Sequence, residues 1–321
     1  MSAPLTTPLQ DVHHQPSVTI ANEARHYVDH RPPYPDSMWE LWTSYHEGPL
    51  TVVHDIGSGS GNAADGLLTH TTSPAKHVIL TEPRDINIKD CRSRFRDRFP
   101  GTSFTYRNCR GEDPWEAPVG VEDVDFVMAC ESLHWTILAP TLDNIAKSLR
   151  GNGTFAAVIY GPFPGITNNT VANAAFKAFI GEHAAHLLKQ EWMTENWKRA
   201  ARQMFHGMDS VPLKDEIWKD VKRIEINCRD GWYAKDYHPL EGTADPVRHL
   251  GTSERVVIDD SKDWRISSSV DWLKQSLESM RFGFTEESWQ SPKWQEMAKE
   301  IGNGALELEW QVHMILARKR V

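Results

Sequence analysis

The sequence predicts an α/β protein with a doubly wound parallel sheet, a helical cap insertion and an antiparallel C-terminal strand. Two observations lead to this fold class. Apolar, strand-like runs alternate with helix-like segments from residue 51 to about residue 160, which is the order of β-α-β units in a parallel sheet. Residues 162–220 then break the alternation with helical sequence, and the last apolar run, 305–319, has the alternating pattern of an antiparallel strand.

The first unit, residues 51–68, reads TVVHDIGSGSGNAADGLL. Its apolar start predicts a buried strand. Gly57, Gly59 and Gly61 predict a sharp turn into a helix, because glycine adopts backbone angles that other residues avoid. Such a turn cradles a ligand of nucleoside size, and Asp55 at the strand exit is an acceptor for a ligand's ammonium group. These features predict a site for S-adenosylmethionine.

The same glycines also satisfy a relaxed dinucleotide fingerprint, G-x-G-x-x-A over residues 59–64, with Glu82 at the usual distance downstream. A carboxylate after the second strand binds the ribose hydroxyls of either cofactor, so Glu82 does not separate them. Asp55 before the first glycine favours S-adenosylmethionine. The chain has no recognisable Tyr-x-x-x-Lys pair, which weighs against the alternative of an NAD-dependent oxidoreductase.

The later units follow in the same order. Strands are predicted at 77–82, 102–108, 124–130 and 154–161, and helices up to about 70, over 86–99 and over 140–149. Ligands of such sheets bind beyond the carboxyl ends of the strands. Four polar residues fall at these ends, namely Asp55, Glu82, Asn108 and Glu131.

Four regions are predicted along the chain: a mobile arm at 1–20, a cofactor-binding core at 21–161, a helical cap at 162–220, and further core strands and helices at 221–321. Prolines 32, 33 and 35 stiffen a strap that brings Tyr27, Arg31 and Tyr34 ahead of the first strand. Asp36 is expected to cap the helix that follows.

Composition argues against several classes of function. The net charge of −9 does not favour a polyanion such as nucleic acid, and the basic run at 92–98 is interpreted as a solvated helix face. No apolar run approaches the roughly 20 residues that span a bilayer, and the N-terminus lacks a signal pattern.

The four cysteines form no CxxC pair, which favours reduced thiols over a metal or disulfide scaffold. We expect a cytoplasmic monomer or homodimer with a small-molecule acceptor, and no metal, nucleic acid or membrane partner.

With these pieces placed, the chain resembles the class I S-adenosylmethionine-dependent methyltransferases, and most of all the trans-aconitate methyltransferase group of fungi and bacteria. The segments that carry the likeness are RPPYP at 31–35, DIGSGSG at 55–61, ESLHW at 131–135 and ILARKRV at 315–321. The resemblance implies a seven-stranded Rossmann-like sheet whose late antiparallel strand is reached through a hairpin. It also implies methyl transfer that converts S-adenosylmethionine to S-adenosylhomocysteine.

The resemblance also implies roles for individual residues. The cofactor's methionine part would contact Asp55, Gly57, Ser58 and Gly59, its ribose Glu82, and its adenine Asn108 and Glu112. The methyl group would lie beside Glu131, His134 and Trp135, with Tyr27 and Arg31 contributing from the strap. Glu131, Tyr27 and Arg31 count among the cofactor-binding candidates, His134 and Glu131 are the catalytic candidates, and the acceptor candidates are Tyr34, Trp135 and Tyr160.

Methyl transfer from a sulfonium is an in-line displacement, in which orientation supplies on the order of 7–11 kcal/mol. An acceptor carboxylate is already ionised, whereas a hydroxyl needs a base, for which His134 is the candidate because its ordinary pKa lies near neutrality. We therefore expect O-methylation of a carboxylate or hydroxyl.

The acceptor class stays open between two possibilities. The resemblance favours a small carboxylic acid, for which the cap offers Lys198, Arg199 and Arg202, while the tryptophans crowded in the second half of the chain suit an aromatic or polyketide-like secondary metabolite. The main alternative function is a protein of the methyltransferase fold that binds S-adenosylmethionine for a regulatory role or for another reaction. A protein or RNA methyltransferase is a weaker one.

Overall fold

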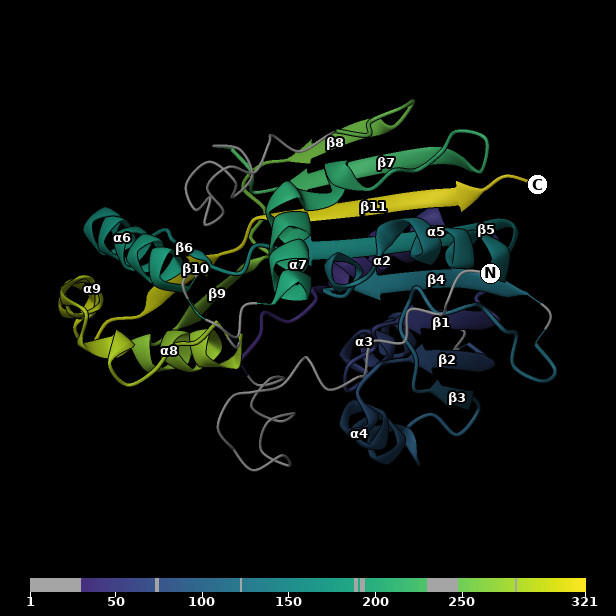
Figure 1. Cartoon of the computed structure of the whole chain (residues 1–321), viewed down its shortest axis with the longest axis horizontal. Helices are drawn as coiled ribbons and strands as arrows, with labels where there is room; N and C mark the ends of the chain where they lie inside the picture. The colour runs from purple at the N-terminus through teal and green to yellow at the C-terminus, as the bar shows by residue number, and fades with distance from the viewer. Residues whose placement is uncertain are drawn as a thin grey trace.

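The computed structural model describes residues 30–72, 75–121, 123–187, 190, 194–229, 248–280 and 282–321. Its centre is an eight-stranded sheet in the order β3-β2-β1-β4-β5-β11-β7-β8 (Figure 1). These strands are β1 Val52–Ile56, β2 His77–Thr81, β3 Ser103–Arg107, β4 Val124–Cys130, β5 Leu149–Tyr160, β7 Trp218–Ile226, β8 Glu254–Ile258 and β11 Val312–Lys319. Strands β1 to β5 are parallel, and β11 is antiparallel to both β5 and β7. The predicted fold class is confirmed.

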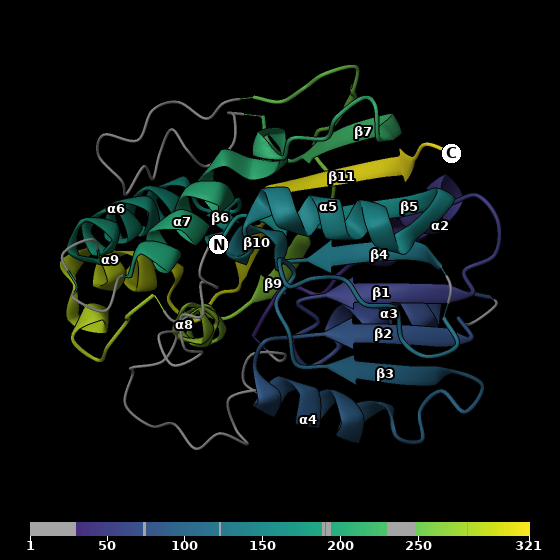
Figure 2. The same ribbon diagram turned by 45° about the vertical axis from the view of Figure 1, so that its right-hand side comes forward.

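Helices cover both faces of this sheet. They are α2 Asp36–Tyr45, α3 Asn62–His70, α4 Asp85–Phe95 and α5 Leu138–Ser148. In Figure 2, α5 lies in front of the sheet and α2 and α3 lie behind it. Strand β4 is buried along its whole length between these layers, which explains its almost continuously apolar sequence.

A second layer lies beyond the carboxyl ends of β1, β2 and β4 (Figures 1 and 2). It contains a three-stranded sheet of β6 Gly165–Ile166, β10 Leu306–Glu309 and β9 Arg265–Ser268, with α6 Thr170–Leu187, α8 Val270–Ser279 and α9 Pro292–Ile301. Helix α7, Glu195–His206, packs against the short helices η2, Leu133–Trp135, and η3, Gly207–Ser210. A further short helix, η5, spans Ser288–Gln290. Two long helices, α6 and α7, thus occupy the predicted range 162–220.

Two expectations about strands were wrong. The sheet has eight strands where the resemblance implied seven, because β8 adds to its edge parallel to β7. The final run is not one strand, since it divides at Trp310 and Gln311 into β10 and β11, which belong to different sheets. The Trp310 N–H donates to the Trp264 carbonyl, and the Gln311 carbonyl accepts from the Gly161 N–H. These hydrogen bonds to distant residues separate β10 from β11 at Trp310 and Gln311. The alternating sequence pattern of the run does not indicate this break.

Two smaller expectations also need correction. Asp36 is the first residue of α2, and it accepts a hydrogen bond from His70 at 2.6 Å instead of capping the helix. The basic run is only partly a solvated face, since Arg94 donates to the Ser60 carbonyl and Arg98 pairs with Asp65. Within the described ranges, no helix is long and apolar enough to cross a membrane.

Helix α3 packs on α2 through a glycine in its middle, and this contact yields a stability prediction. A Cβ added at Gly66 would lie 2.5 Å from the buried Trp39 ring. In an open helix, Gly→Ala gains about 1 kcal/mol, but overpacking costs about 1–3 kcal/mol. We therefore expect Gly66→Ala to lower the free energy of unfolding in urea. Gly181→Ala in α6, where a Cβ meets nothing within 4 Å, is the control and should raise it. Equal gains would contradict the packing argument.

Candidate active site

The glycine turn, residues 57–61, connects β1 to α3. The Gly57 and Ser58 N–H groups donate to the Thr81 carbonyl at 2.8 and 3.0 Å, so the turn is anchored to the end of β2. Gly57, Gly59 and Gly61 have φ values of 67°, 55° and 88°, in the left-handed region that favours glycine. Side chains at 57 and 61 would collide with Ser132 and Phe95, whereas one at Gly59 would meet nothing within 4 Å. The turn is therefore tightly packed at two glycines and open at the third.

Asp55 lies next to this turn, in β1, and is almost completely buried. Neither carboxylate oxygen has a well-formed hydrogen bond to any residue that the structure describes. The pKa of the carboxyl is raised to about 7, mainly by burial and to a smaller extent by nearby Glu82, while the approach of the Ala64 N–H opposes the shift. A buried acid without a partner is costly in a folded protein, and a cationic ligand would satisfy it.

Glu82 follows β2 and faces the turn from the neighbouring strand. Its carboxylate accepts from the Gly59 N–H at 3.2 Å, the Arg84 N–H at 3.1 Å and the Asn87 amide at 2.9 Å. Burial raises the pKa of this carboxyl, and the three donors oppose the shift. A carboxylate offers about four acceptor positions, so one remains for a ligand hydroxyl.

The segment after β3 contains the two residues expected near adenine. Asn108 is exposed, and its amide donates to the Glu82 and Pro83 carbonyls at 3.3 and 3.1 Å. Glu112 is half-buried beside Gly111, whose missing side chain leaves room for Ile56. The structure therefore brings this segment against the cofactor strand, while the adenine roles of Asn108 and Glu112 stay predictions.

Glu131 is the first residue after β4 and has an unusual backbone. Its φ of 53° is left-handed, which is uncommon for a residue with a side chain and is typical of functional sites. The carboxylate accepts from the Tyr160 N–H at 2.5 Å. Burial raises its pKa to about 8, while the Tyr160 N–H and the positive charge of Arg31 oppose the shift. The predicted catalytic acid is thus held at the junction of β4, β5 and the strap.

His134 lies in η2, three residues further on, and is buried. Burial, together with a smaller effect of the Arg31 charge, lowers the pKa of its imidazole to about 3. The imidazole is therefore neutral at pH 7, but it is a weak base. A general base works best with a pKa near the working pH, so this environment does not favour deprotonation of an ordinary hydroxyl.

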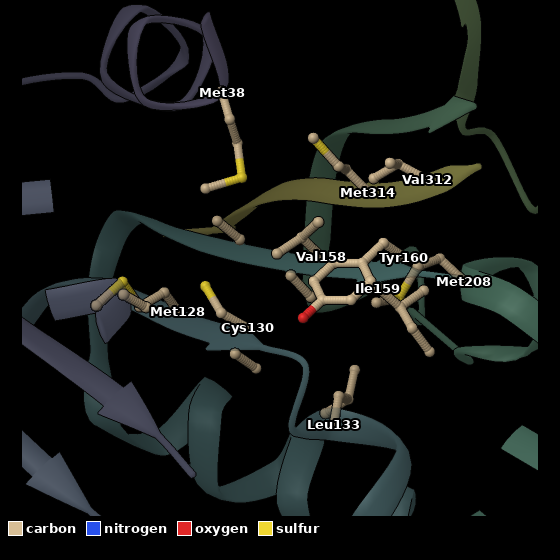
Figure 3. Close-up of a cluster of buried hydrophobic side chains, with 14 of the residues drawn as sticks. Met38, Met128, Cys130, Leu133, Val158, Ile159, Tyr160, Met208, Val312 and Met314 are labelled. Carbon is tan, nitrogen blue, oxygen red and sulfur yellow. The ribbon is translucent and has the colours of Figure 1, made fainter. Parts of the chain in front are cut away.

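The three acceptor candidates occupy different surroundings. Tyr160, at the end of β5, is buried among the side chains of β4, β5 and η2, with its hydroxyl turned toward Cys130 (Figure 3). The ring of Tyr34 lies 6.4 Å from that of Tyr160. Trp135 is 40% exposed, and its ring meets Trp197 of α7 edge-on at 4.7 Å. Tyr34 and Tyr160 thus form one group, and Trp135 lies toward α7.

Sequence reasoning missed two residues that hold the glycine turn. Ser132 donates to the Ile56 carbonyl at 2.5 Å, and Arg94 donates to the Ser60 carbonyl at 3.2 Å. Their partners lie 76 and 34 residues away along the chain, so no local pattern predicts either contact. The one available signal was Gly57 itself, because a glycine at such a turn often marks a close backbone approach.

Tyr27, the remaining candidate, lies outside the described residues, as does the predicted arm at 1–20. Among the residues that are described, no three His, Cys, Asp or Glu side chains gather as a metal site.

Comparisons with known proteins identify relatives of this chain. Residues 54–157 match the family model for a methyltransferase domain. The chain is 26% identical over 299 residues to a methyltransferase of Claviceps purpurea, covering 91% of this chain and 90% of that one. It is 24% identical to methyltransferase AacuQ of Aspergillus aculeatus, covering 92% of each. A third relative, CRG1 of Saccharomyces cerevisiae, is described as a probable S-adenosylmethionine-dependent methyltransferase and is 30% identical over 139 residues, 43% of this chain and 45% of that one.

The matched methyltransferase domain runs from β1 into β5, and the relatives that match over most of this chain are also methyltransferases. The protein is accordingly an S-adenosylmethionine-dependent methyltransferase. Its residues fit the cofactor, since Asp55 has no well-formed hydrogen bond to a described residue, Gly59 faces open space and Glu82 retains an acceptor position. When bound, the cofactor supplies an electrophilic methyl group on its sulfonium. Which residues contact each part of it stays a prediction.

Proposed function

We propose that the protein transfers a methyl group to an oxygen of a small, largely apolar acceptor that carries a carboxylate or an acidic hydroxyl. The observation that carries this proposal is the position of Arg31, whose guanidinium donates to the carbonyl of Ser279 at the end of α8 at 3.4 Å and whose charge acts on both Glu131 and His134 at the carboxyl end of β4. A guanidinium at that place suits an anionic acceptor oxygen. Such an oxygen needs no base, which accords with the weakly basic His134.

Aromatic side chains from both layers support an apolar acceptor body. The ring of Tyr160 lies 6.2 Å from that of Trp264, just before β9, and the ring of Trp197 in α7 lies 6.0 Å from that of Phe282. Trp197 and Phe282 are half-buried, and accessible aromatic rings of this kind bind planar apolar molecules. The named relatives from Claviceps and Aspergillus are fungal methyltransferases, which is consistent with an acceptor from secondary metabolism.

An acceptor with several carboxylates, as in the trans-aconitate group, receives less support. It would need two or three cations directed at one place. In the cap, Lys198 pairs with Glu195 of its own helix at 2.7 Å. Arg199 donates to Asn196 and to the Trp135 carbonyl at 3.1 and 3.0 Å. A monoacid or an acidic phenol on an apolar skeleton is therefore the favoured acceptor.

The first experiment is thermal stabilisation of the full chain by S-adenosylmethionine, S-adenosylhomocysteine and NAD, followed by S-adenosylhomocysteine release over a panel of aliphatic acids, aromatic acids and phenols. A ligand at a hundredfold excess over its Kd stabilises by about 2.7 kcal/mol. We expect stabilisation by the first two ligands and turnover with aromatic acids or acidic phenols. Stabilisation without turnover on any acceptor would favour a regulatory binding protein.

The roles of Arg31 and His134 can then be separated with an acceptor from that panel. We expect Arg31→Ala to lower kcat/KM about ten- to hundredfold, because a hydrogen bond to a charged group is worth about 1.5–3 kcal/mol. His134→Asn should cost less than about tenfold, since general base catalysis contributes about 10²–10⁴-fold where it operates. A larger loss in His134→Asn than in Arg31→Ala, measured as initial rates, would mean that the histidine acts as a base.

A further inference from the structure

The glycine turn and the segment at 131–135 touch directly, although they lie far apart in the sequence. The contact is between Gly57 and Ser132, since a Cβ at Gly57 would lie 2.5 Å from the Ser132 Cβ and 3.1 Å from its hydroxyl oxygen. The two backbones therefore approach as closely as a glycine allows. The glycine turn belongs to the part of the site where we expect the methyl donor. The segment at 131–135 contains Glu131 and His134.

Ser132 adds a specific hydrogen bond to this contact. The residue immediately precedes η2, where a serine ordinarily accepts from a helical N–H through its side chain. It makes no such cap here, and its buried hydroxyl donates instead to the carbonyl of Ile56, the last residue of β1. Its own carbonyl accepts from the Trp135 N–H at 3.0 Å. Ser132 thus immediately precedes η2 and ties it to the strand that leads into the glycine turn.

We propose that Ser132 is a positioning residue that couples the glycine turn to residues 131–135 and so sets the distance between methyl donor and acceptor. The turn is held on its other side by the Thr81 carbonyl, so it is fixed between β2 and Ser132. In-line transfer is sensitive to this spacing, because a misplacement of about 1 Å can cost about 10²-fold in rate. The inference rests on the proposed placing of the acceptor beside residues 131–135.

The test measures hydrogen exchange of the full chain with and without S-adenosylhomocysteine, so it needs no acceptor. In the wild type, we expect the ligand to slow exchange both in the turn and in residues 132–136. In Ser132→Ala, the affinity for S-adenosylhomocysteine, measured by calorimetry, should weaken by no more than about threefold. The ligand should still protect the glycine turn from hydrogen exchange. Protection of 132–136 should fall by about fivefold or more. Once an acceptor is known, kcat should fall about ten- to hundredfold while both KM values change little.

Ser148→Ala is the matched control, because Ser148 is also buried and donates to a carbonyl, that of Ile145, within α5. It should leave both protected regions unchanged. Ser132→Cys keeps the Cβ and a weak donor, so it should show an intermediate loss of protection and serves if the alanine variant does not fold. Full protection of 132–136 in the Ser132 variants, or none there in a wild type whose turn is protected, would overturn the coupling. Absence of ligand binding by the wild type would instead contradict the methyltransferase function.

Discussion

Asp55→Asn is expected to weaken S-adenosylmethionine binding about ten- to hundredfold while leaving the apo protein at least as stable as the wild type. The buried carboxylate has no well-formed hydrogen bond among the described residues, so its replacement by a neutral amide removes an unpaired charge. The same change removes the acceptor for the ligand's ammonium, worth about 1.5–3 kcal/mol. Urea unfolding and calorimetry measure the two effects separately.

Asp125→Asn is the matched control for this prediction. Asp125 is buried too, but its carboxylate accepts from the Thr51 and Val52 N–H groups and from Arg150 at 2.9, 2.8 and 2.5 Å. We expect this variant to lose stability and to keep its affinity for the cofactor. If Asp55→Asn instead bound S-adenosylmethionine normally, the assignment of Asp55 to the ammonium group would be wrong.

The same carboxyl predicts a pH dependence of binding. Its pKa in the apo protein is raised to about 7, and the ammonium binds its ionised form. The affinity for S-adenosylmethionine should therefore rise about tenfold between pH 5.5 and 7, and binding in this range should release a proton. The range lies below the pKa of about 7.7–8.0 of the ligand's amino group, so the ligand keeps its ammonium charge throughout. For stability the sign is reversed: the unfolded carboxyl ionises near pH 3.8, so this group destabilises the apo fold progressively from about pH 4 to 7. Both trends should disappear in Asp55→Asn.

Gly57→Ala and Gly59→Ala are expected to differ sharply, although both place alanine at a positive φ. That backbone strain costs about 1–2 kcal/mol at either position. At Gly57 the new Cβ also collides with Ser132, and such overpacking adds about 1–3 kcal/mol. Thermal unfolding should therefore show the larger loss of stability for Gly57→Ala. Gly59→Ala should stay folded, because its Cβ meets nothing within 4 Å, and it should lose affinity for S-adenosylmethionine, because we expect the ligand to occupy that open space.

A combined variant checks the cause of the Gly57 effect. Adding Ser132→Gly to Gly57→Ala removes the Cβ with which the new methyl group collides, so the double variant should recover the packing part of the loss but not the strain part. Strict additivity of the two single changes would show that the collision is not the cause. Equal stability of the Gly57 and Gly59 variants would contradict the same argument.

Much of this protein follows from local patterns in its sequence. The alternation of strands and helices, the buried β4 and the glycine turn at 57–61 depend on residues adjacent in the chain, where periodicity and backbone freedom act directly. For that reason the order of elements, the fold class and the kind of cofactor could be predicted. Asp55 and Glu82 were predicted in the same way, because Asp55 lies near the end of one recognisable strand and Glu82 directly follows the next.

The remaining features depend on contacts between distant segments. The division of the last run at Trp310 depends on Trp264 and Gly161, and the eighth strand depends on an edge left open by β7. In the candidate site, the tertiary structure decided that Asp55 has no well-formed hydrogen bond within the described part of the chain, that His134 is buried and weakly basic, and that Ser132 joins two segments. Burial and long-range hydrogen bonds set the charge of these groups and their spacing, and neither is encoded by neighbouring residues alone. The sequence therefore determined what kind of ligand this protein binds, while the packing of its strands determined the electrostatics of the site.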